Sequence, residues 1–129
     1  ELYRAEESDI RKEIRPLGFQ NRRTKCLKSV GEMLKENNSE VPEVEEKLQK
    51  PWRVGEYAAK ATMLFGFDHS VELIDSNIAS AAENILDYPH TTAPHKDQDF
   101  RALMSALTPS SPKIARGFYF ALIDFEFPK

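Results

Sequence analysis

Apolar side chains recur along this chain at intervals of three or four residues, the spacing that brings them onto one face of an α-helix. Ile10 and Ile14 lie four residues apart, and Leu27, Val30 and Leu34 form a longer stripe of the same kind. No segment shows the sustained alternation of apolar and polar residues that is typical of a half-buried strand. The pattern predicts about seven short helices, over residues 8–15, 21–36, 42–50, 56–65, 75–86, 97–107 and 114–125.

Residues that break or cap helices set the ends of these segments. Pro16 ends the first helix, Asn21 can cap the second, and Pro42 suits the first position of the third. Gly31 lies inside the second helix, where glycine is unfavourable, so we expect a neighbouring segment to pack closely against it. The expected fold is all-α, a compact multi-helix domain that covers residues 1–129 as a single unit.

The composition is typical of one soluble globular domain, because the 129 residues are 40% hydrophobic and 30% charged. No apolar run is long enough to span a membrane, and we expect no membrane partner. The single cysteine, Cys26, excludes an internal disulfide and any four-cysteine cluster, and it favours a reducing compartment. We therefore expect an intracellular protein, nuclear if the source is a eukaryote and cytoplasmic if it is a prokaryote.

Positive and negative side chains are separated along the chain, although the formal net charge is only −3. Basic residues crowd the segment 11–28, and glutamates crowd the segment 40–46. The basic segment indicates either a face that contacts nucleic acid or an ordinary solvated helix face, with equal weight. The three histidines, His69, His90 and His95, lack metal-ligand spacing, so no metal site is expected from them.

The segment 48–77 has the pattern of a helix end, a tight turn around Val54 and Gly55, a second helix, a loop and an acid. Glycine at the turn allows a partner to approach the backbone closely. The helix after the turn would direct N–H groups and its positive dipole end outward, which predicts a phosphate site. Asp75 follows an apolar run and precedes Ser76, so we expect it at the start of the next helix.

Three blocks in this segment resemble the helix-hairpin-helix DNA glycosylase superfamily, nearest to the branch that removes mismatched thymine, uracil or adenine. They are Val-Gly-x-Tyr-x-Ala at 54–59, Phe-Gly at 65–66 and Ile-Asp-Ser-Asn at 74–77. Flanking residues agree with the family pattern at 14–19, at the basic positions 22, 23 and 25, and at Val-Pro 41–42. The resemblance covers about residues 8–125.

The resemblance implies a helix-hairpin-helix motif and, as partner, double-stranded DNA with a flipped base. Compared with the family, the chain lacks the usual N-terminal helices and the iron–sulfur loop. No iron–sulfur cluster is therefore expected, and either another chain or a longer precursor would supply the missing helices. Related hairpins hold a monovalent cation through backbone carbonyls, and the family pattern would place such a cation around Trp52 and Val54.

The resemblance implies two catalytic residues, Asp75 and Tyr57. Asp75 would be the carboxylate that stabilises the developing oxocarbenium sugar and orients or deprotonates the attacking water, and the alternative is a simple helix N-cap. Tyr57 stands where family members with lyase activity carry a lysine that attacks the sugar. Because a phenol cannot form a Schiff base, Tyr57 implies a monofunctional glycosylase, and the alternative is a half-buried core aromatic. Lys60, one helical turn further on, is expected to point elsewhere.

The remaining implied site residues contact DNA. They are Arg22, Arg23, Lys25, Arg53, Val54, Gly55, Glu56 and Asn77. Arg53 replaces a turn glycine of the family, and a positive φ at this position would cost about 1 kcal/mol or more. Ala79, Ala81 and Ala82 stand where the family usually has arginines, so the helix after Asp75 is expected to lose phosphate contacts.

These inferences favour a monofunctional glycosylase of DNA base-excision repair. Such a hydrolase acts on the N-glycosidic bond of a mismatched or damaged base, for example thymine or uracil opposite guanine. The alternative is a catalytically inactive helix-hairpin-helix relative that binds DNA or a protein, which Arg53 and the missing arginines favour. A plain helical interaction domain with an accidental motif match ranks third.

Overall fold

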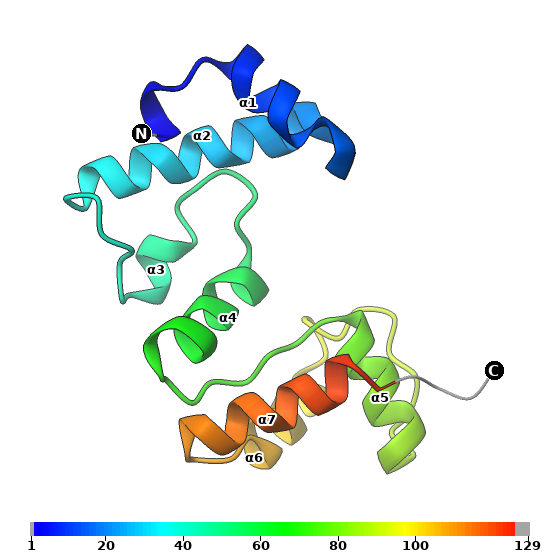
Figure 1. Ribbon diagram of the computed structural model, residues 1–129. Helices are drawn as coiled ribbons and strands as arrows, with labels where there is room; N and C mark the ends of the chain where they lie inside the picture. The colour runs from blue at the N-terminus through cyan, green and yellow to red at the C-terminus, as the bar shows by residue number, and fades with distance from the viewer. Residues whose placement is uncertain (1, 126–129) are drawn as a thin grey trace. The chain divides into compact units, whose positions relative to one another are not determined.

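The computed structural model describes residues 2–125, and all regular structure within this range is helical (Figure 1). The elements are η1 (Leu2–Arg4), α1 (Glu7–Ile14), η2 (Arg15–Leu17), α2 (Gln20–Glu36), α3 (Glu45–Leu48), α4 (Glu56–Phe67), α5 (Ser76–Leu86), α6 (Gln98–Leu107) and α7 (Pro112–Ile123), where η marks a short 3-10 helix. The all-α fold predicted from the apolar spacing is confirmed. None of the helices described has both the length and the apolar character that a membrane-spanning helix requires.

The helix α3 differs most from its prediction, because it has one turn where the sequence predicted a helix from Pro42. Val44 at its N-cap position is extended, with φ −140° and ψ 121°, so the helix cannot begin before it. Pro42 is buried in the loop that precedes it. The other predicted helices agree with the structure to within two residues at each end.

The chain forms two compact units, a first unit up to Ala59 and a second unit from Lys60 onward. The division falls inside α4, so this helix contributes its first turn to the first unit and its remainder to the second. The single domain predicted over the whole chain stays a prediction.

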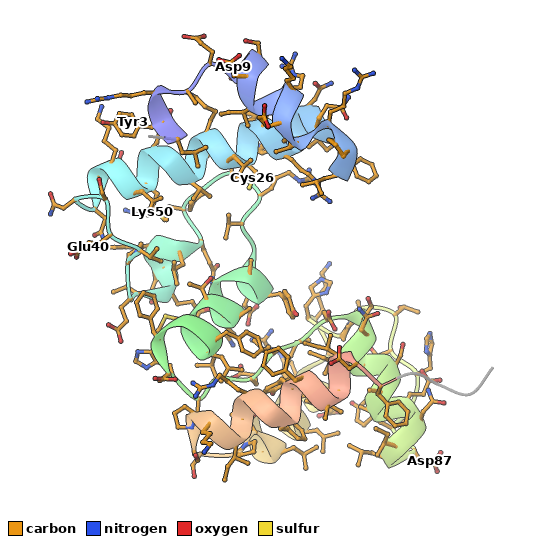
Figure 2. All side chains as sticks on the ribbon, in the orientation of Figure 1. Tyr3, Asp9, Cys26, Glu40, Lys50 and Asp87 are labelled. Carbon is orange, nitrogen blue, oxygen red and sulfur yellow. The ribbon has the colours of Figure 1, made fainter. Side chains whose placement is uncertain are left out.

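The first unit is built on α2, against which α1 and η1 pack. Tyr3 of η1 lies next to α2 (Figure 2). A Cβ added at Gly31 of α2 would be 2.8 Å from the backbone nitrogen of Tyr3. Lys28, one turn earlier on α2, donates hydrogen bonds to the carbonyls of Tyr3 and Ala5, at 2.7 and 2.8 Å. The close neighbour predicted from Gly31 is therefore confirmed, and it is the N-terminal 3-10 turn.

The second unit has one hydrophobic cluster, to which the C-terminal part of α4 and the helices α5, α6 and α7 all contribute. Leu64, Ile78, Phe100 and Tyr119 are fully buried in it, one from each of these four helices. Because α5 begins directly after Asp75 and contributes buried residues to this cluster, Asp75 lies next to the core of the second unit.

Candidate functional site

The segment between α3 and α4, where the sequence predicts the hairpin, contains a tight turn over Pro51–Val54. The Val54 amide donates a hydrogen bond to the Pro51 carbonyl, at 3.0 Å. Arg53, the third residue of the turn, has a φ of +62°, the left-handed value that a type II turn requires at this position. Arg53 therefore has the positive φ that strains the backbone of an arginine, and this strain costs about 1 kcal/mol or more.

Trp52 connects this turn to α2, and two cationic side chains lie near its ring. Its backbone amide donates to Ser29 Oγ of α2, at 2.8 Å. Lys25 Nζ lies 4.6 Å from the ring centroid, and the guanidinium carbon of Arg53 lies 5.5 Å from it. These distances are those of cation–π contacts. The structure thus brings together two of the predicted DNA-binding residues, Lys25 and Arg53, through an aromatic residue that was not among them.

Gly55 lies directly before α4 and is exposed, whereas its neighbours Val54 and Glu56 are half-buried. A Cβ built at Gly55 would meet no atom of the first unit within 4 Å. Its φ is also outside the left-handed region, since the one positive-φ glycine among the described residues is Gly18. Neither the turn nor crowding inside the unit explains this glycine, and close approach by an external group stays a prediction.

The predicted phosphate contacts Arg22 and Arg23 are exposed on the first part of α2. Phe19, the residue directly before α2, is 75% exposed and has a left-handed φ of +49°. Leu17 is 61% exposed on the other side of Gly18. Neither residue was among the predicted site residues, although both are large apolar side chains between the helices predicted over residues 8–15 and 21–36.

Asp75 is the N-cap of α5. Its backbone is extended, with φ −148° and ψ −178°, and Oδ1 accepts a hydrogen bond from the Ile78 amide, at 2.8 Å. The other carboxylate oxygen has no hydrogen-bond partner among residues 2–125. The predicted position of Asp75 before a helix that starts with Ser76 is confirmed, and the capping interpretation accounts for one of its two oxygens. Its catalytic role stays a prediction.

Asp97 offers a direct comparison, because it caps α6 in the same way. Its Oδ1 accepts from the Phe100 amide, at 2.9 Å, and this hydrogen bond is the main reason that the pKa of Asp97 lies below its ordinary value. Unlike Asp75, Asp97 also has the Tyr88 hydroxyl 3.4 Å from both of its oxygens. Each acid is the N-cap of its own helix, and the two differ in what else their carboxylates contact.

Tyr57 lies in the first turn of α4 and is 36% exposed. This exposure agrees both with the predicted site residue and with a half-buried core aromatic. Lys60, one turn later, is buried, and its ammonium nitrogen lies 2.5 Å from Glu72 Oε1. The lysine nearest to the predicted sugar-binding position is therefore engaged in an ion pair. This confirms the expectation that Lys60 points elsewhere.

Asn77 is exposed in the first turn of α5. Buried alanines follow it in the helix. Ala79, Ala81 and Ala82 are 7%, 0% and 2% exposed. A long basic side chain at any of these three positions would disrupt the core of the second unit. The predicted loss of phosphate contacts from this helix therefore has a physical reason, which is that these positions are used for packing.

The site predicted from the sequence combines residues of both units. The hairpin, Tyr57 and the basic residues of α2 belong to the first unit, and Asp75 and Asn77 belong to the second. Their juxtaposition stays a prediction, as does a monovalent cation at the hairpin carbonyls. Within the described part of the chain, no three histidine, cysteine or acidic side chains come together in a way that could hold a metal ion.

The all-helical fold and the N-cap acid at the start of α5 agree with the expectations that the resemblance gave. The chain is 28% identical over 119 residues to a thymine/uracil-DNA glycosylase of Pyrobaculum aerophilum, a match that covers 91% of this chain and 52% of that protein. It is 27% identical over 125 residues to a thymine-DNA glycosylase of Aeropyrum pernix, covering 95% of this chain and 56% of that one. These matches confirm the resemblance that the motifs indicate.

The chain spans about half the length of the curated relatives that it matches. No family model matches the chain, and no solved structure matches it significantly.

Proposed function

We propose that the chain acts in DNA base excision as a glycosylase, hydrolysing the N-glycosidic bond of a mismatched or damaged base. Thymine or uracil opposite guanine is the proposed substrate class. The observation that carries this proposal is the match of 91% and 95% of the chain to proteins named thymine/uracil- and thymine-DNA glycosylase. Because the chain covers only about half of each, its activity and its DNA partner are part of the proposal.

In this proposal, Asp75 supplies the carboxylate that the reaction needs. Breaking the glycosidic bond leaves positive charge on the sugar, and a nearby carboxylate stabilises that charge and positions a water molecule for attack. The Ile78 amide occupies one oxygen of Asp75 at 2.8 Å, and the second oxygen is available for this role. The cap and the catalytic role are therefore compatible in one side chain.

The proposed reaction is monofunctional, so it ends at an abasic site. A lyase reaction needs an unprotonated amine that attacks the sugar carbon. Tyr57 stands at the position where lyase members of the family carry that lysine, and Lys60 on the same helix is held by Glu72 at 2.5 Å.

The proposed DNA contacts combine the turn and the basic part of α2. Arg53 and Lys25, stacked on Trp52, and the exposed Arg22 would contact phosphates, which positions the strand without reading its sequence. The exposed Phe19 is an apolar side chain of the kind that inserts between base steps and unstacks them. Unstacking would assist the target base in leaving the duplex, which is a requirement for its excision.

A second candidate function is a catalytically inactive relative that binds DNA or a protein. Two observations favour it. The cap explains the presence of an acid at position 75 without catalysis, and the buried Ala79, Ala81 and Ala82 leave α5 without the arginines that the family carries there.

Base release from labelled duplexes tests the proposal. The full chain is incubated with duplexes that contain G·T, G·U and undamaged pairs, and each product is divided into samples with and without hot alkali. We expect release from a mismatched duplex and strand cleavage only after alkali. Cleavage without alkali would contradict the monofunctional assignment. Duplex binding without release from any substrate would favour the second candidate.

A further inference from the structure

Polar side chains fix the connector between α4 and α5, residues 68–75, although it has no regular structure. Its first residue, Asp68, pairs with Arg116 of α7. Ser70 donates a hydrogen bond to the carbonyl of Pro109, in the loop between α6 and α7. All of these residues belong to the second unit. The connector is therefore attached to other parts of this unit before it reaches α5.

An ion pair between Glu72 and Lys60 of α4 is more enclosed than the pair that Asp68 forms with Arg116. Lys60 Nζ lies 2.5 Å from Glu72 Oε1, and the two side chains are 11% and 23% exposed. Arg101 of α6 brings a guanidinium nitrogen to 4.0 Å from the same oxygen. One carboxylate of the connector thus contacts cations from two different helices.

Stability alone does not explain this ion pair. Lysine is seldom buried, and removing two charges from water commonly costs as much free energy as their attraction returns. Apolar side chains of similar volume would therefore stabilise the unit equally well. An ion pair differs from an apolar contact because it joins particular atoms at a fixed distance. It thereby selects one arrangement of the connector against the core.

The acid at the end of the connector is the group that depends on this arrangement. Glu72 lies three residues before Asp75, and the residues between them, Leu73 and Ile74, are buried at 0% and 9% exposure. Asp75 itself is held through its hydrogen bond to Ile78, which belongs to the helix that it caps. A displacement of about 1 Å at a reacting group can cost roughly 100-fold in rate.

We infer that Lys60 and Glu72 are positioning residues for Asp75. Their ion pair fixes the connector so that the carboxylate at the start of α5 has one position relative to the core of the second unit. The effect on catalysis rests on the proposed glycosylase function, whereas the effect on the position of Asp75 rests on the geometry of this unit alone.

The test compares variants of the full chain that remove the pair with one that removes another contact of the same connector. Glu72→Gln removes one charge with little change in shape. The double variant Lys60→Met/Glu72→Leu replaces the pair by apolar side chains and so leaves no unpaired buried charge. Asp68→Asn is the control, because it breaks the contact with Arg116 at the far end of the connector.

The first readout is single-turnover base release beside duplex binding. We expect the rate to fall roughly 10- to 100-fold in Glu72→Gln and in the double variant, because Asp75 is displaced. The dissociation constant should change by less than about threefold, since neither residue contacts DNA in this account. Asp68→Asn should behave like the wild type. A double variant with the wild-type rate would overturn the inference.

The second readout, hydrogen exchange at the Ile78 amide, does not require activity. This amide reports its hydrogen bond to Asp75, and we expect it to exchange about tenfold faster in the double variant while the Phe100 amide on α6 is unchanged. Unchanged exchange at Ile78 would overturn the inference even in an active enzyme. Faster exchange at Ile78 in a protein that releases no base would support the positioning role and reject the proposed function.

Discussion

Arg53 is one of six non-glycine residues within 2–125 that have a left-handed φ. It has a left-handed φ of +62° in an exposed turn, and its guanidinium lies against Trp52. Backbone strain of this kind is concentrated at functional sites, where it is retained because the side chain has a task. In this account the task is contact with a DNA phosphate.

Arg53→Gly should therefore weaken duplex binding and leave the fold intact. Relief of the strained backbone offsets the lost stack on Trp52 and the added chain entropy of glycine, so the free energy of unfolding should stay within about 1 kcal/mol. The slope of log affinity against log salt should decrease in magnitude by about one. Denaturant titration and binding at several salt concentrations measure both quantities.

Lys47→Gln is the matched control for this prediction. Lys47 is exposed in α3 of the same unit, outside the predicted DNA-binding residues, and its loss changes the net charge by the same amount. If the two variants bind duplex equally well, Arg53 contributes only its charge and the phosphate contact is wrong.

Single residues also show how far the sequence alone leads. The N-cap at Asp75 follows from local chemistry. The positive φ at Arg53 does so too, because both features depend on residues that are close in the chain. The pair between Lys60 and Glu72 could not be predicted, since twelve residues separate them and only tertiary packing brings them together. The stack of Lys25 on Trp52 was missed for the same reason.

At the scale of elements, two interior glycines have opposite surroundings. Gly31 of α2 lies beneath η1, and an added Cβ would be 2.8 Å from the Tyr3 nitrogen. Gly117 of α7 has no atom within 4 Å of an added Cβ. Alanine is the better helix former at both positions by about 1 kcal/mol, so the two differ only in whether the new methyl group has room.

Gly31→Ala should lower the free energy of unfolding by roughly 1 kcal/mol, because overpacking against the backbone exceeds the gain in helix propensity. Gly117→Ala should raise the free energy of unfolding by about 1 kcal/mol. Chemical denaturation of the two variants beside the wild type measures both. An increase in stability from Gly31→Ala would show that η1 is not closely packed on α2.

Element boundaries were predictable where a capping or breaking residue coincides with the end of an apolar stripe, as at Asp75 and Asp97. The exception, α3, shows the limit of that reasoning. Proline at position 42 is compatible with a helix start, but the extended backbone of Val44 delays the helix to Glu45. Proline permits a helix start without requiring one, and the path of the loop decided the outcome.

At the scale of the whole molecule, the proposed DNA-binding residues of α2 and the turn belong to the first unit, and the proposed reacting group, Asp75, belongs to the second. The formal net charge of −3 gives no general attraction to DNA, so binding has to come from the local basic residues of α2 and the turn. The fold class and the relationship to the glycosylases were predictable, because helical spacing and short motifs are local. Contacts between distant residues, such as that of Lys25 with Trp52, depend on tertiary packing that no local pattern encodes.

The central claim is that Asp75 reacts as well as caps, and the chain contains its own control. Asp75→Asn and Asp97→Asn each replace an N-cap acid by asparagine, which caps equally well, so both proteins should fold. Both variants change a capping acid, Asp97→Asn also alters the contact with the Tyr88 hydroxyl, and only Asp75→Asn removes the carboxylate that is proposed to react. Both are compared with the wild type in duplex binding and in single-turnover base release.

Release of uracil from a G·U duplex by these two variants is the most direct measurement. The account predicts that Asp75→Asn lowers the single-turnover rate by on the order of 1,000-fold while duplex affinity stays within about threefold. Asp97→Asn should release base at nearly the wild-type rate. If Asp75→Asn releases base as fast as Asp97→Asn, the carboxylate at the start of α5 is a helix cap and nothing more, and the catalytic account is wrong.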